Sequence, residues 1–243
     1  MVVPLLSLVI PAYNEESLLP ALLESIRTSV AEWAREAGAV EVILADNSST
    51  DQTSEIARSS GATVVRVPVR GIGTARNGGA AVAHGQVLCF VDADSRIHPQ
   101  TFRAVAAAMD RPKVGGGVTG VKPERWSGAL RLMAAMTLPA RVLGIDSGVV
   151  FCRRADFTAI NGYRTDLLVA EDVDFLWRLR HHARRAGNAL VRLKSVETIT
   201  STRKFDKYGH WRFMRALGGL AVNRALAPKR FRQDVQRYWY DDR

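Results

Sequence analysis

The sequence predicts an α/β protein built on a doubly wound, mostly parallel sheet with helices on both faces. Within the first 91 residues, short apolar runs rich in β-favouring residues alternate with stretches of helical periodicity, which is typical of parallel strands joined by helices. Polar residues follow the first, second and fourth of these runs. Because such sheets bind ligands beyond the carboxyl ends of their strands, we expect these polar residues to share one crevice.

The elements of this first half can be placed in order. Strands are expected at residues 5–10, 40–45, 63–67 and 86–91, and helices at 15–36, 52–60 and 71–83. The first helix has Leu18, Leu22 and Ile26 at helical spacing and Gly38 as its stop. Thr50 or Asp51 is expected to cap the second helix.

The second half is less regular. The sequence indicates a helix over 99–109, a glycine-rich strand over 115–121, an amphipathic helix or helix pair over 126–143 broken at Pro139, a return to the sheet over 146–152, and helices over 157–163 and 173–186. No internal repeat and no low-complexity linker is evident, so we expect a single functional unit.

Composition limits the class of protein. At 243 residues and 47% hydrophobic content, the chain is long enough to bury a substantial core. Cys89 and Cys152 give neither a disulfide framework nor metal-ligand spacing, so we expect reduced core thiols in a cytoplasmic protein. The start lacks a basic leader, and no uncharged apolar stretch approaches the roughly 20 residues that span a bilayer.

Charge is unevenly distributed along the chain. Residues 1–110 hold 8 Lys/Arg and 12 Asp/Glu, whereas residues 111–243 hold 26 and 12. A positive field of this kind attracts phosphates, nucleic acid or an anionic membrane surface.

An Asp-x-Asp pair, Asp92 and Asp94, directly follows the fourth apolar run. At the carboxyl end of a central strand, one carboxylate can bind a hard divalent cation while the other accepts hydrogen bonds from hydroxyls. The structural alternative is a solvated turn or a helix N-cap, since Ser95 and Pro99 also suit a turn.

Five motifs in order resemble the family-2 glycosyltransferases of GT-A fold. They are Pro11-Ala12-Tyr13-Asn14-Glu15, Asp46 to Thr53, Ala75-Arg76-Asn77-x-Gly79, Asp92-Ala93-Asp94 and Glu171-Asp172-Val173-Asp174. The resemblance covers about residues 5–205 and implies transfer of a sugar from a nucleotide diphosphate donor, usually with inversion and with Mg²⁺ or Mn²⁺. It implies a catalytic domain over 1–200, with a nucleotide-binding half (1–110) and an acceptor half (111–200), followed by a basic aromatic extension over 201–243.

Carried over position by position, the resemblance assigns nucleotide-sugar binding to Pro11, Tyr13, Glu15, Asp46, Arg76, Asp92, Ala93 and Glu171. Tyr13 offers a flat face on which a pyrimidine can stack. Asp46 matches the carboxylate that accepts the imide N–H of a uracil-like base, which favours a UDP-sugar, although it also suits a turn or cap. Arg76 matches a cation near the base and phosphates, and its alternative is a solvated helix arginine.

The remaining roles concern the metal and the proton. Asp94 matches the metal ligand, and His210 is the histidine available to complete that site. Asp172 is the expected general base that takes the proton of the acceptor hydroxyl, at a helix N-terminus that favours an ionised carboxylate. Asp174 competes for this role, and capping of the helix is the structural alternative.

Three other functions fit the sequence less well. A sugar nucleotidylyltransferase of related fold needs a glycine-rich loop after its first strand, and this chain has Pro11 to Asn14 there. A non-catalytic polyanion-binding protein would use the same cations, yet no nucleic-acid recognition motif is present. The dinucleotide fingerprint has Arg76 in place of its third glycine.

The partners follow from the same reading. We expect a nucleotide-sugar donor and no nucleic acid. Arginines of the second half suggest an anionic or lipid-linked acceptor; they are Arg153, Arg154, Arg178, Arg180, Arg184 and Arg185, with solvated helix faces as the alternative. The extension suits peripheral contact with the inner membrane face or a homodimer.

Overall fold

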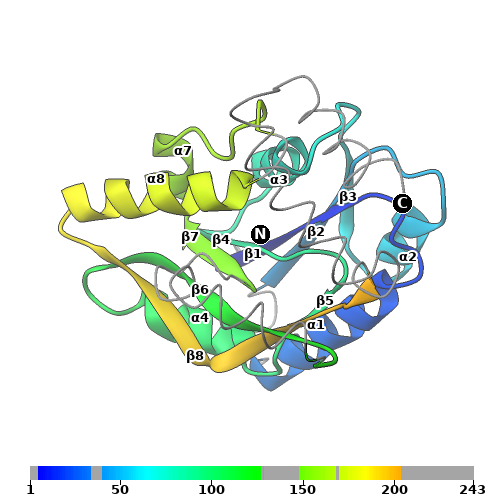
Figure 1. Ribbon diagram of the computed structural model, residues 1–243, viewed down its shortest axis with the longest axis horizontal. Coiled ribbons are helices and arrows are strands. Elements are labelled where there is room, and N and C mark those ends of the chain that lie inside the picture. The colour runs from blue at the N-terminus through cyan, green and yellow to red at the C-terminus, as the bar shows by residue number, and fades with distance from the viewer. Residues whose placement is uncertain (1–4, 34–39, 127, 129–147, 168–169, 204–243) are drawn as a thin grey trace.

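A computed structural model describes residues 5–33, 40–126, 128, 148–167 and 170–203 (Figure 1). The strands are β1 (Leu6–Ala12), β2 (Val40–Asp46), β3 (Thr63–Arg66), β4 (Val87–Phe90), β5 (Ser95–Arg96), β6 (Val114–Pro123), β7 (Val150–Arg153) and β8 (Ala189–Thr200). The helices are α1 (Leu19–Trp33), α2 (Thr53–Ser59), α3 (Ile72–Ala81), α4 (Thr101–Met109), α7 (Arg154–Ala159) and α8 (Glu171–Arg185).

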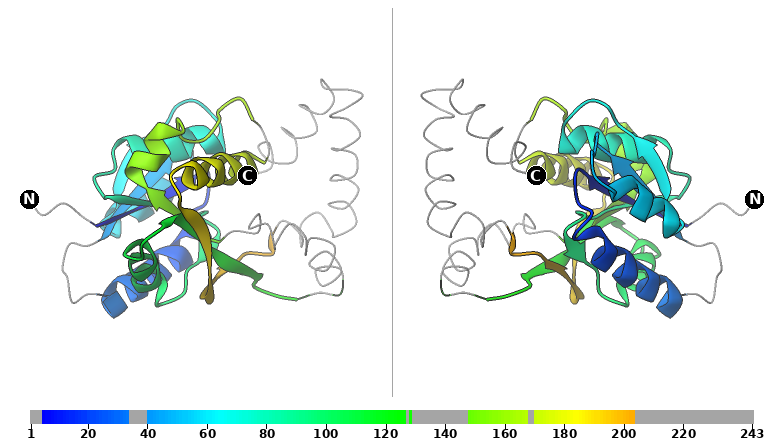
Figure 2. Two further views of the ribbon diagram at one scale, coloured as in Figure 1. Left: turned by 90° about the vertical axis from the view of Figure 1, so that its left-hand side faces the viewer. Right: turned by 90° about the vertical axis from the view of Figure 1, so that its right-hand side faces the viewer.

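The strands form one sheet in the order β3-β2-β1-β4-β7-β6-β8-β5. Strands β3, β2, β1 and β4 are mutually parallel, and β7 runs antiparallel to both β4 and β6. Helices α1 and α4 cover one face, and α3, α7 and α8 cover the other (Figures 1 and 2). The predicted fold class is therefore confirmed, with the antiparallel strands β7 and β5 within the mostly parallel sheet.

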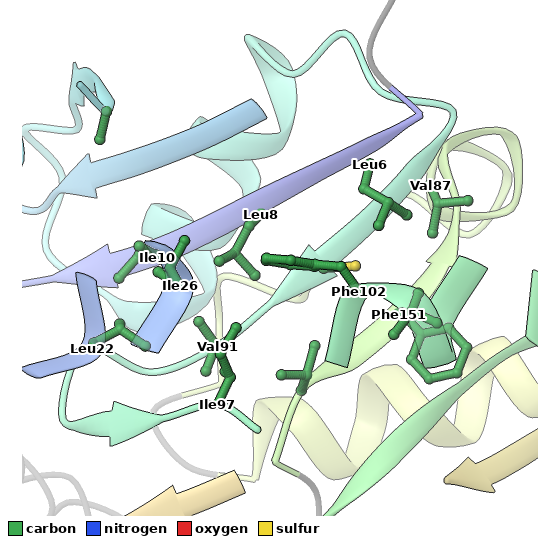
Figure 3. Packing of buried hydrophobic residues seen from close by; sticks show 14 of the residues in the cluster. Leu6, Leu8, Ile10, Leu22, Ile26, Val87, Val91, Ile97, Phe102 and Phe151 are labelled. Carbon is green, nitrogen blue, oxygen red and sulfur yellow. The ribbon is translucent and has the colours of Figure 1, made fainter. Parts of the chain in front are cut away.

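The core on the α1 side explains why the first elements form where they do. Leu8 and Ile10 of β1 pack against Leu22 and Ile26 of α1, and Phe102 of α4 lies beside them (Figure 3). All of these side chains are buried, and each contributes roughly 1.5–3 kcal/mol of transfer free energy. The apolar residues of β1 and the apolar faces of α1 and α4 thus pack into one layer.

Helix α3 lies unusually close to the sheet because it carries glycines where it crosses the strands. A Cβ added at Gly79 would lie 2.4 Å from Val9 Cγ1, and one added at Gly78 would lie 2.5 Å from Val67 Cγ2. No side chain fits at these two positions without displacement of the strands. The glycines therefore bring the backbone of α3 against β1 and the segment after β3.

Several predicted boundaries differ from the structure. Helix α1 begins at Leu19 because the Glu15 carbonyl accepts from the amides of Leu18 and Leu19 in a preceding turn. Gln52 occupies the N-cap position of α2 without a side-chain bond, while Asp51 accepts from the Thr53 amide at 3.0 Å. Helix α7 starts three residues before the predicted position.

Strands β5 and β8 were not predicted at all. Strand β8 pairs with β6 in parallel, and its register shifts between Thr119 and Gly120, where the partner changes from Leu193 to Glu197. The irregularity breaks the two-residue period by which a strand is recognised. The predicted helix over 126–143 lies outside the described residues apart from positions 126 and 128, and most of the extension over 201–243 lies outside them as well.

Both cysteines are buried and free. Burial raises the pKa of the Cys89 thiol to about 12. Within the described part of the chain, no helix has both the length and the apolar character needed to cross a bilayer.

Candidate active site

The carboxyl ends of the first strands bring the predicted polar residues to one edge of the sheet. Ala12 of β1 pairs with Asp46 of β2, and Tyr13 follows directly. Asp92 follows β4, which pairs with β1 on its other side. Pro11, which lacks an amide N–H, lies beyond Val9, the last residue of β1 in register with β4, so no hydrogen bond of that ladder is lost.

Asp46 is buried, with 7% of its surface exposed, and it holds the turn that follows β2. One oxygen accepts from the Ser49 amide at 2.9 Å, and the other accepts from the Ser54 hydroxyl at 2.8 Å. A carboxylate offers about four acceptor positions, so these bonds do not exhaust its capacity. The turn interpretation and the base-binding interpretation of Asp46 are therefore compatible.

Asn47 holds the loop between β3 and α3 against the end of β2. Its amide nitrogen donates to the carbonyls of Val67 and Val69 at 2.8 Å each, and its Oδ1 accepts from the Gly71 amide at 2.8 Å. This loop places the guanidinium carbon of Arg70 3.3 Å from the centre of the Tyr13 ring. A cation therefore lies against one face of the ring predicted to stack with a base, which leaves the other face for stacking, an arrangement that sequence reasoning missed.

We expect Asn47→Asp to destabilise the protein by about 2–3 kcal/mol, because the carboxylate cannot donate to two buried or half-buried carbonyls and repels them. Urea unfolding measures the change in the free energy of unfolding. Ser48→Ala is the matched control, since it removes only a 3.3 Å bond to the Pro68 carbonyl. Equal stability of Asn47→Asp and the wild type would contradict the assigned role.

Arg76 of α3 lies between two predicted site residues. Its Nη2 donates to Asp92 Oδ1 at 2.8 Å and its Nη1 donates to Glu171 Oε1 at 2.9 Å. Only 7% of Arg76 is exposed, so the alternative of a solvated helix arginine is wrong. Because Glu171 is 95 residues further along the chain, these two ion pairs bring the Asp-x-Asp motif and the Glu-Asp motif to one place.

Charge and burial oppose each other at this cluster. Burial is the largest effect on Glu171 and raises the pKa of its carboxyl; Arg76 lowers that pKa, Asp172 and Asp92 raise it, and the net shift is upward. Burial is also the largest effect on Arg76 and lowers its pKa, but Asp92 and the other neighbouring acids reverse the sign and raise it overall. Arg76 is therefore charged at any working pH.

Asp94 and Glu15 are held by the segment that follows β8. The Asp94 carbonyl accepts from the Ser201 amide at 3.1 Å. Arg203 Nη2 donates to Glu15 Oε2 at 2.9 Å, and the Glu15 side chain is only 3% exposed. Glu15, which was predicted to bind the nucleotide sugar, thus directs its carboxylate at Arg203. Arg203 is a second residue that sequence reasoning missed.

Asp172 and Asp174 differ in their surroundings at the start of α8. Asp174 Oδ2 accepts from Arg178 Nε at 2.7 Å in an ion pair one helical turn apart. Asp172 Oδ1 accepts from the Val173 amide at 2.9 Å. Ala170, which precedes Glu171, has a left-handed backbone with φ of 59°, a conformation that costs a non-glycine residue roughly 1–2 kcal/mol. Such local strain is common at functional sites.

Ala93 and His210 are the remaining predicted site residues. Ala93 is buried and packs in the core on the α1 side, so only its backbone can face a ligand. His210 lies outside the described residues. Within residues 5–203 as described, no group of three or more His, Cys, Asp and Glu side chains is arranged to hold a metal.

A mixed sheet with acidic residues after β2 and β4 and a Glu-Asp pair opening a late helix defines the GT-A class of transferases. Solved structures of this fold superpose well: glucosyl-3-phosphoglycerate synthase from Mycobacterium tuberculosis gives a TM-score of 0.59 at 26% identity over 88% of this chain and 78% of that one. TarS from S. aureus gives 0.64 at 24% identity, over 87% of this chain and 39% of that one.

The family model described as "Glycosyl transferase family 2" matches residues 7–165, and the chain belongs to this family. A PGL/p-HBAD biosynthesis glycosyltransferase of Mycobacterium bovis (strain BCG / Pasteur 1173P2) is 30% identical over 187 residues, which are 72% of this chain and 69% of that protein. Validoxylamine A glucosyltransferase of Streptomyces hygroscopicus subsp. limoneus is 35% identical over 127 residues, 49% of this chain and 26% of that protein. The chain thus spans only about a quarter of the latter.

Proposed function

We propose that this protein transfers a sugar from a nucleotide diphosphate donor to an acceptor hydroxyl, with inversion at the anomeric carbon. The observation that carries the proposal is the pair of bonds from Arg76 to Asp92 and Glu171. These bonds place the expected donor-binding acid and the start of the helix that bears Asp172 at the same strand ends. A donor on one side and a base on the other is the arrangement that inverting transfer requires.

Asp46 and Tyr13 are proposed to recognise the nucleobase. Asp46 can accept the imide N–H of uracil with its remaining acceptor capacity, and Tyr13 offers its ring. Relatives support a nucleotide donor: TarS was solved with UDP-GlcNAc and with UDP, and a mannosyltransferase from Pyrobaculum calidifontis with GDP-Man and Mn²⁺. We favour a UDP-sugar because the acid at position 46 suits an imide.

The acids after β4 fit a divalent cation. Hard cations such as Mg²⁺ and Mn²⁺ prefer carboxylate oxygens, and Mg²⁺ is commonly held by one or two carboxylates together with substrate phosphates. Asp94 supplies such an oxygen, and Asp92, held by Arg76, is proposed to accept from sugar hydroxyls. When bound, the cation would neutralise the departing diphosphate. Mn²⁺ in the complex of glucosyl-3-phosphoglycerate synthase supports this proposal.

Asp172 is proposed to take the proton of the acceptor hydroxyl. Asp174, the competing candidate, has one carboxylate oxygen engaged by Arg178. Asp172 instead follows Glu171 directly and makes its bond to the Val173 amide at the start of α8. The helix dipole makes the first turn of a helix a favourable position for an acidic side chain, which supports Asp172 as the candidate.

The case for an anionic acceptor is weaker than the sequence suggested. Arg153 pairs with Val87 at the start of β4, so it lies at the amino edge of the sheet, away from the acids. Arg153 and Arg154 donate to the carbonyls of Met109 and Ala83, and Arg178 binds Asp174. These three arginines are structural. A lipid-linked acceptor and contact of the extension with a membrane remain proposals.

Thermal unfolding in the presence of nucleotides tests the proposed function. A ligand at 100 times its Kd stabilises the folded state by about 2.7 kcal/mol, which is a rise in Tm of roughly 5–11 °C for a chain of this size. We expect UDP with Mn²⁺ to exceed GDP, dTDP and UDP without metal, and Asp46→Asn to lose the preference for UDP. No shift with any nucleotide in the presence of Mn²⁺ would refute the proposal.

A further inference from the structure

Arg76 joins two carboxylates that come from different halves of the chain. Asp92 follows β4 in the donor half, and Glu171 opens α8 in the second half. Both terminal nitrogens of the guanidinium are used, one for each acid. The arginine side chain is 9% exposed, as is that of Glu171, while the side chain of Asp92 is 51% exposed. This ion-pair bridge is therefore buried at Arg76 and Glu171 and exposed to solvent at Asp92.

We propose that Arg76 is a positioning residue that fixes helix α8, and with it Asp172, relative to the donor carboxylate Asp92. This inference rests on the proposed function and deepens it: Arg76 acts on the reaction through two other side chains rather than through contact with the donor phosphates. The fork of the guanidinium sets both the separation and the orientation of the two acids, because its two arms lie in one rigid plane.

Burial makes the bridge necessary. A buried carboxylate without a paired cation is strongly disfavoured, and removal of one partner of such a pair leaves the other charge uncompensated. The titratable groups that interact with Glu171 come from different elements. They are Arg76 of α3, Asp92 after β4, Tyr163 of the preceding loop and Asp172 of the same helix. Arg76 is the one cation in that set, so Glu171 depends on it.

Neighbouring contacts keep Arg76 in place. Asn77, the next residue on α3, donates to the Tyr163 carbonyl at 2.8 Å and accepts from the Tyr163 amide at 2.8 Å. The guanidinium of Arg76 lies 4.9 Å from the centre of the Tyr163 ring. That ring stacks on Phe175 of α8 with 4.1 Å between centroids. Helix α3 is thus joined to α8 directly through the Arg76–Glu171 ion pair and indirectly through Tyr163, which contacts α3 and stacks on Phe175.

The same geometry argues against direct phosphate binding by Arg76. Its terminal nitrogens are bonded to carboxylates, and Nε, which is buried, has no hydrogen-bond partner among the described residues. Only 9% of the Arg76 side chain is exposed and its charge is already paired with two carboxylates, so the site is poorly suited to a phosphate. The expectation from the family resemblance, a cation close to base and phosphates, is therefore replaced by a bridge between two acids.

Two variants separate the charge of Arg76 from its shape. We expect Arg76→Gln to lower kcat by about 100-fold or more, the effect of a misplacement of about 1 Å, and to change the Kd of UDP by less than about 3-fold, a limit well below the loss expected when a charged phosphate contact is removed. Arg76→Lys keeps the charge but not the planar fork, so kcat should stay at least about 10-fold below that of the wild type.

Stability against pH gives a readout that does not depend on catalysis. Because the folded pKa of Glu171 is raised above its model value of 4.5, the folded state binds more protons between the two values, and stability falls as pH rises through that window. Arg76→Gln should widen the window towards higher pH by about one pH unit. Arg76→Gln combined with Glu171→Gln should abolish that widening, and Arg76→Lys should show none.

Arg178→Gln is the matched control, since it also removes an arginine that is paired with an acid of α8, in this case a half-buried one. It should leave kcat within about 2-fold of the wild type, as expected for two sites that are not coupled. A wild-type kcat in Arg76→Lys, a large rise in the Kd of UDP in Arg76→Gln, or strictly additive effects of Arg76→Gln and Glu171→Gln on stability would overturn the inference. If the wild type transfers no sugar, the proposed function fails, and the stability measurements still decide the bridge.

Discussion

Asp172→Asn is expected to slow sugar transfer by about 10²–10⁴-fold, the range that a positioned general base contributes. The amide cannot take a proton from the acceptor hydroxyl, while its size and its bond with the Val173 amide, seen at 2.9 Å for the carboxylate, are retained. Donor affinity should change little, because Arg76 makes its hydrogen bonds to Asp92 and Glu171 and not to Asp172. Steady-state kinetics with a UDP-sugar and calorimetric titration of UDP separate the two quantities.

Asp174→Asn is the control for this experiment. Asp174 lies on the same turn of α8, and its substitution removes a half-buried ion pair with Arg178, for which an i,i+4 pair contributes about 0.3–0.5 kcal/mol. Turnover of Asp174→Asn should remain within about 2-fold of the wild type, because uncoupled sites show only small effects. The reverse outcome, with loss of turnover in Asp174→Asn and none in Asp172→Asn, would move the base two residues along the helix.

Asp94→Asn is expected to weaken the manganese-dependent binding of UDP by about 100-fold or more. Even substitution of a residue that only hydrogen-bonds to a metal ligand costs about 10–100-fold in metal affinity. The neutral amide is a poorer ligand for a hard cation than a carboxylate. Its backbone bond with Ser201 does not involve the side chain, so the fold should be retained. Isothermal titration of UDP with and without Mn²⁺ measures the metal-dependent part.

Asp110→Asn controls for the loss of one negative charge. Asp110 is exposed and follows α4, ahead of the first residue of β6. Because β6 and β4 both run antiparallel to β7, Asp110 lies at the opposite edge of the sheet from Asp94. Asp110→Asn should leave the Kd of UDP, measured with and without Mn²⁺, unchanged. Metal-dependent binding of wild-type strength in Asp94→Asn would remove Asp94 from the metal site.

The donor half could be predicted from the sequence because its signals are local. Strands β1, β2 and β4 are apolar runs that end in or lead into polar residues, and parallel pairing then brings Tyr13, Asp46 and Asp92 to one edge without further information. The two glycines of α3 were predicted only as a helix entry. Their close approach to β1 and to Val67 depends on packing that no spacing rule describes.

Other contacts could not be predicted because they join distant parts of the chain. The Glu15–Arg203 pair depends on β8, and β8 was missed because its register shift interrupts the alternation of apolar and polar residues. The contact of Arg70 with Tyr13 depends on three bonds of Asn47 within a loop. Neither arginine carries a local sign of its role: Arg70 follows the apolar run Val67-Pro68-Val69, and Arg203 stands next to Lys204 in a basic segment.

The Glu15–Arg203 pair also bears on how the protein is made. The acid belongs to the first turn of the chain and its cation is 188 residues further on. During synthesis at about 5–20 residues per second, the ribosome releases the acid roughly ten to forty seconds before the cation. The nascent domain therefore cannot form this ion pair until translation has passed β8. Assembly of this part of the predicted site is expected to be a late step, and chaperones have access to the incomplete chain in the interval.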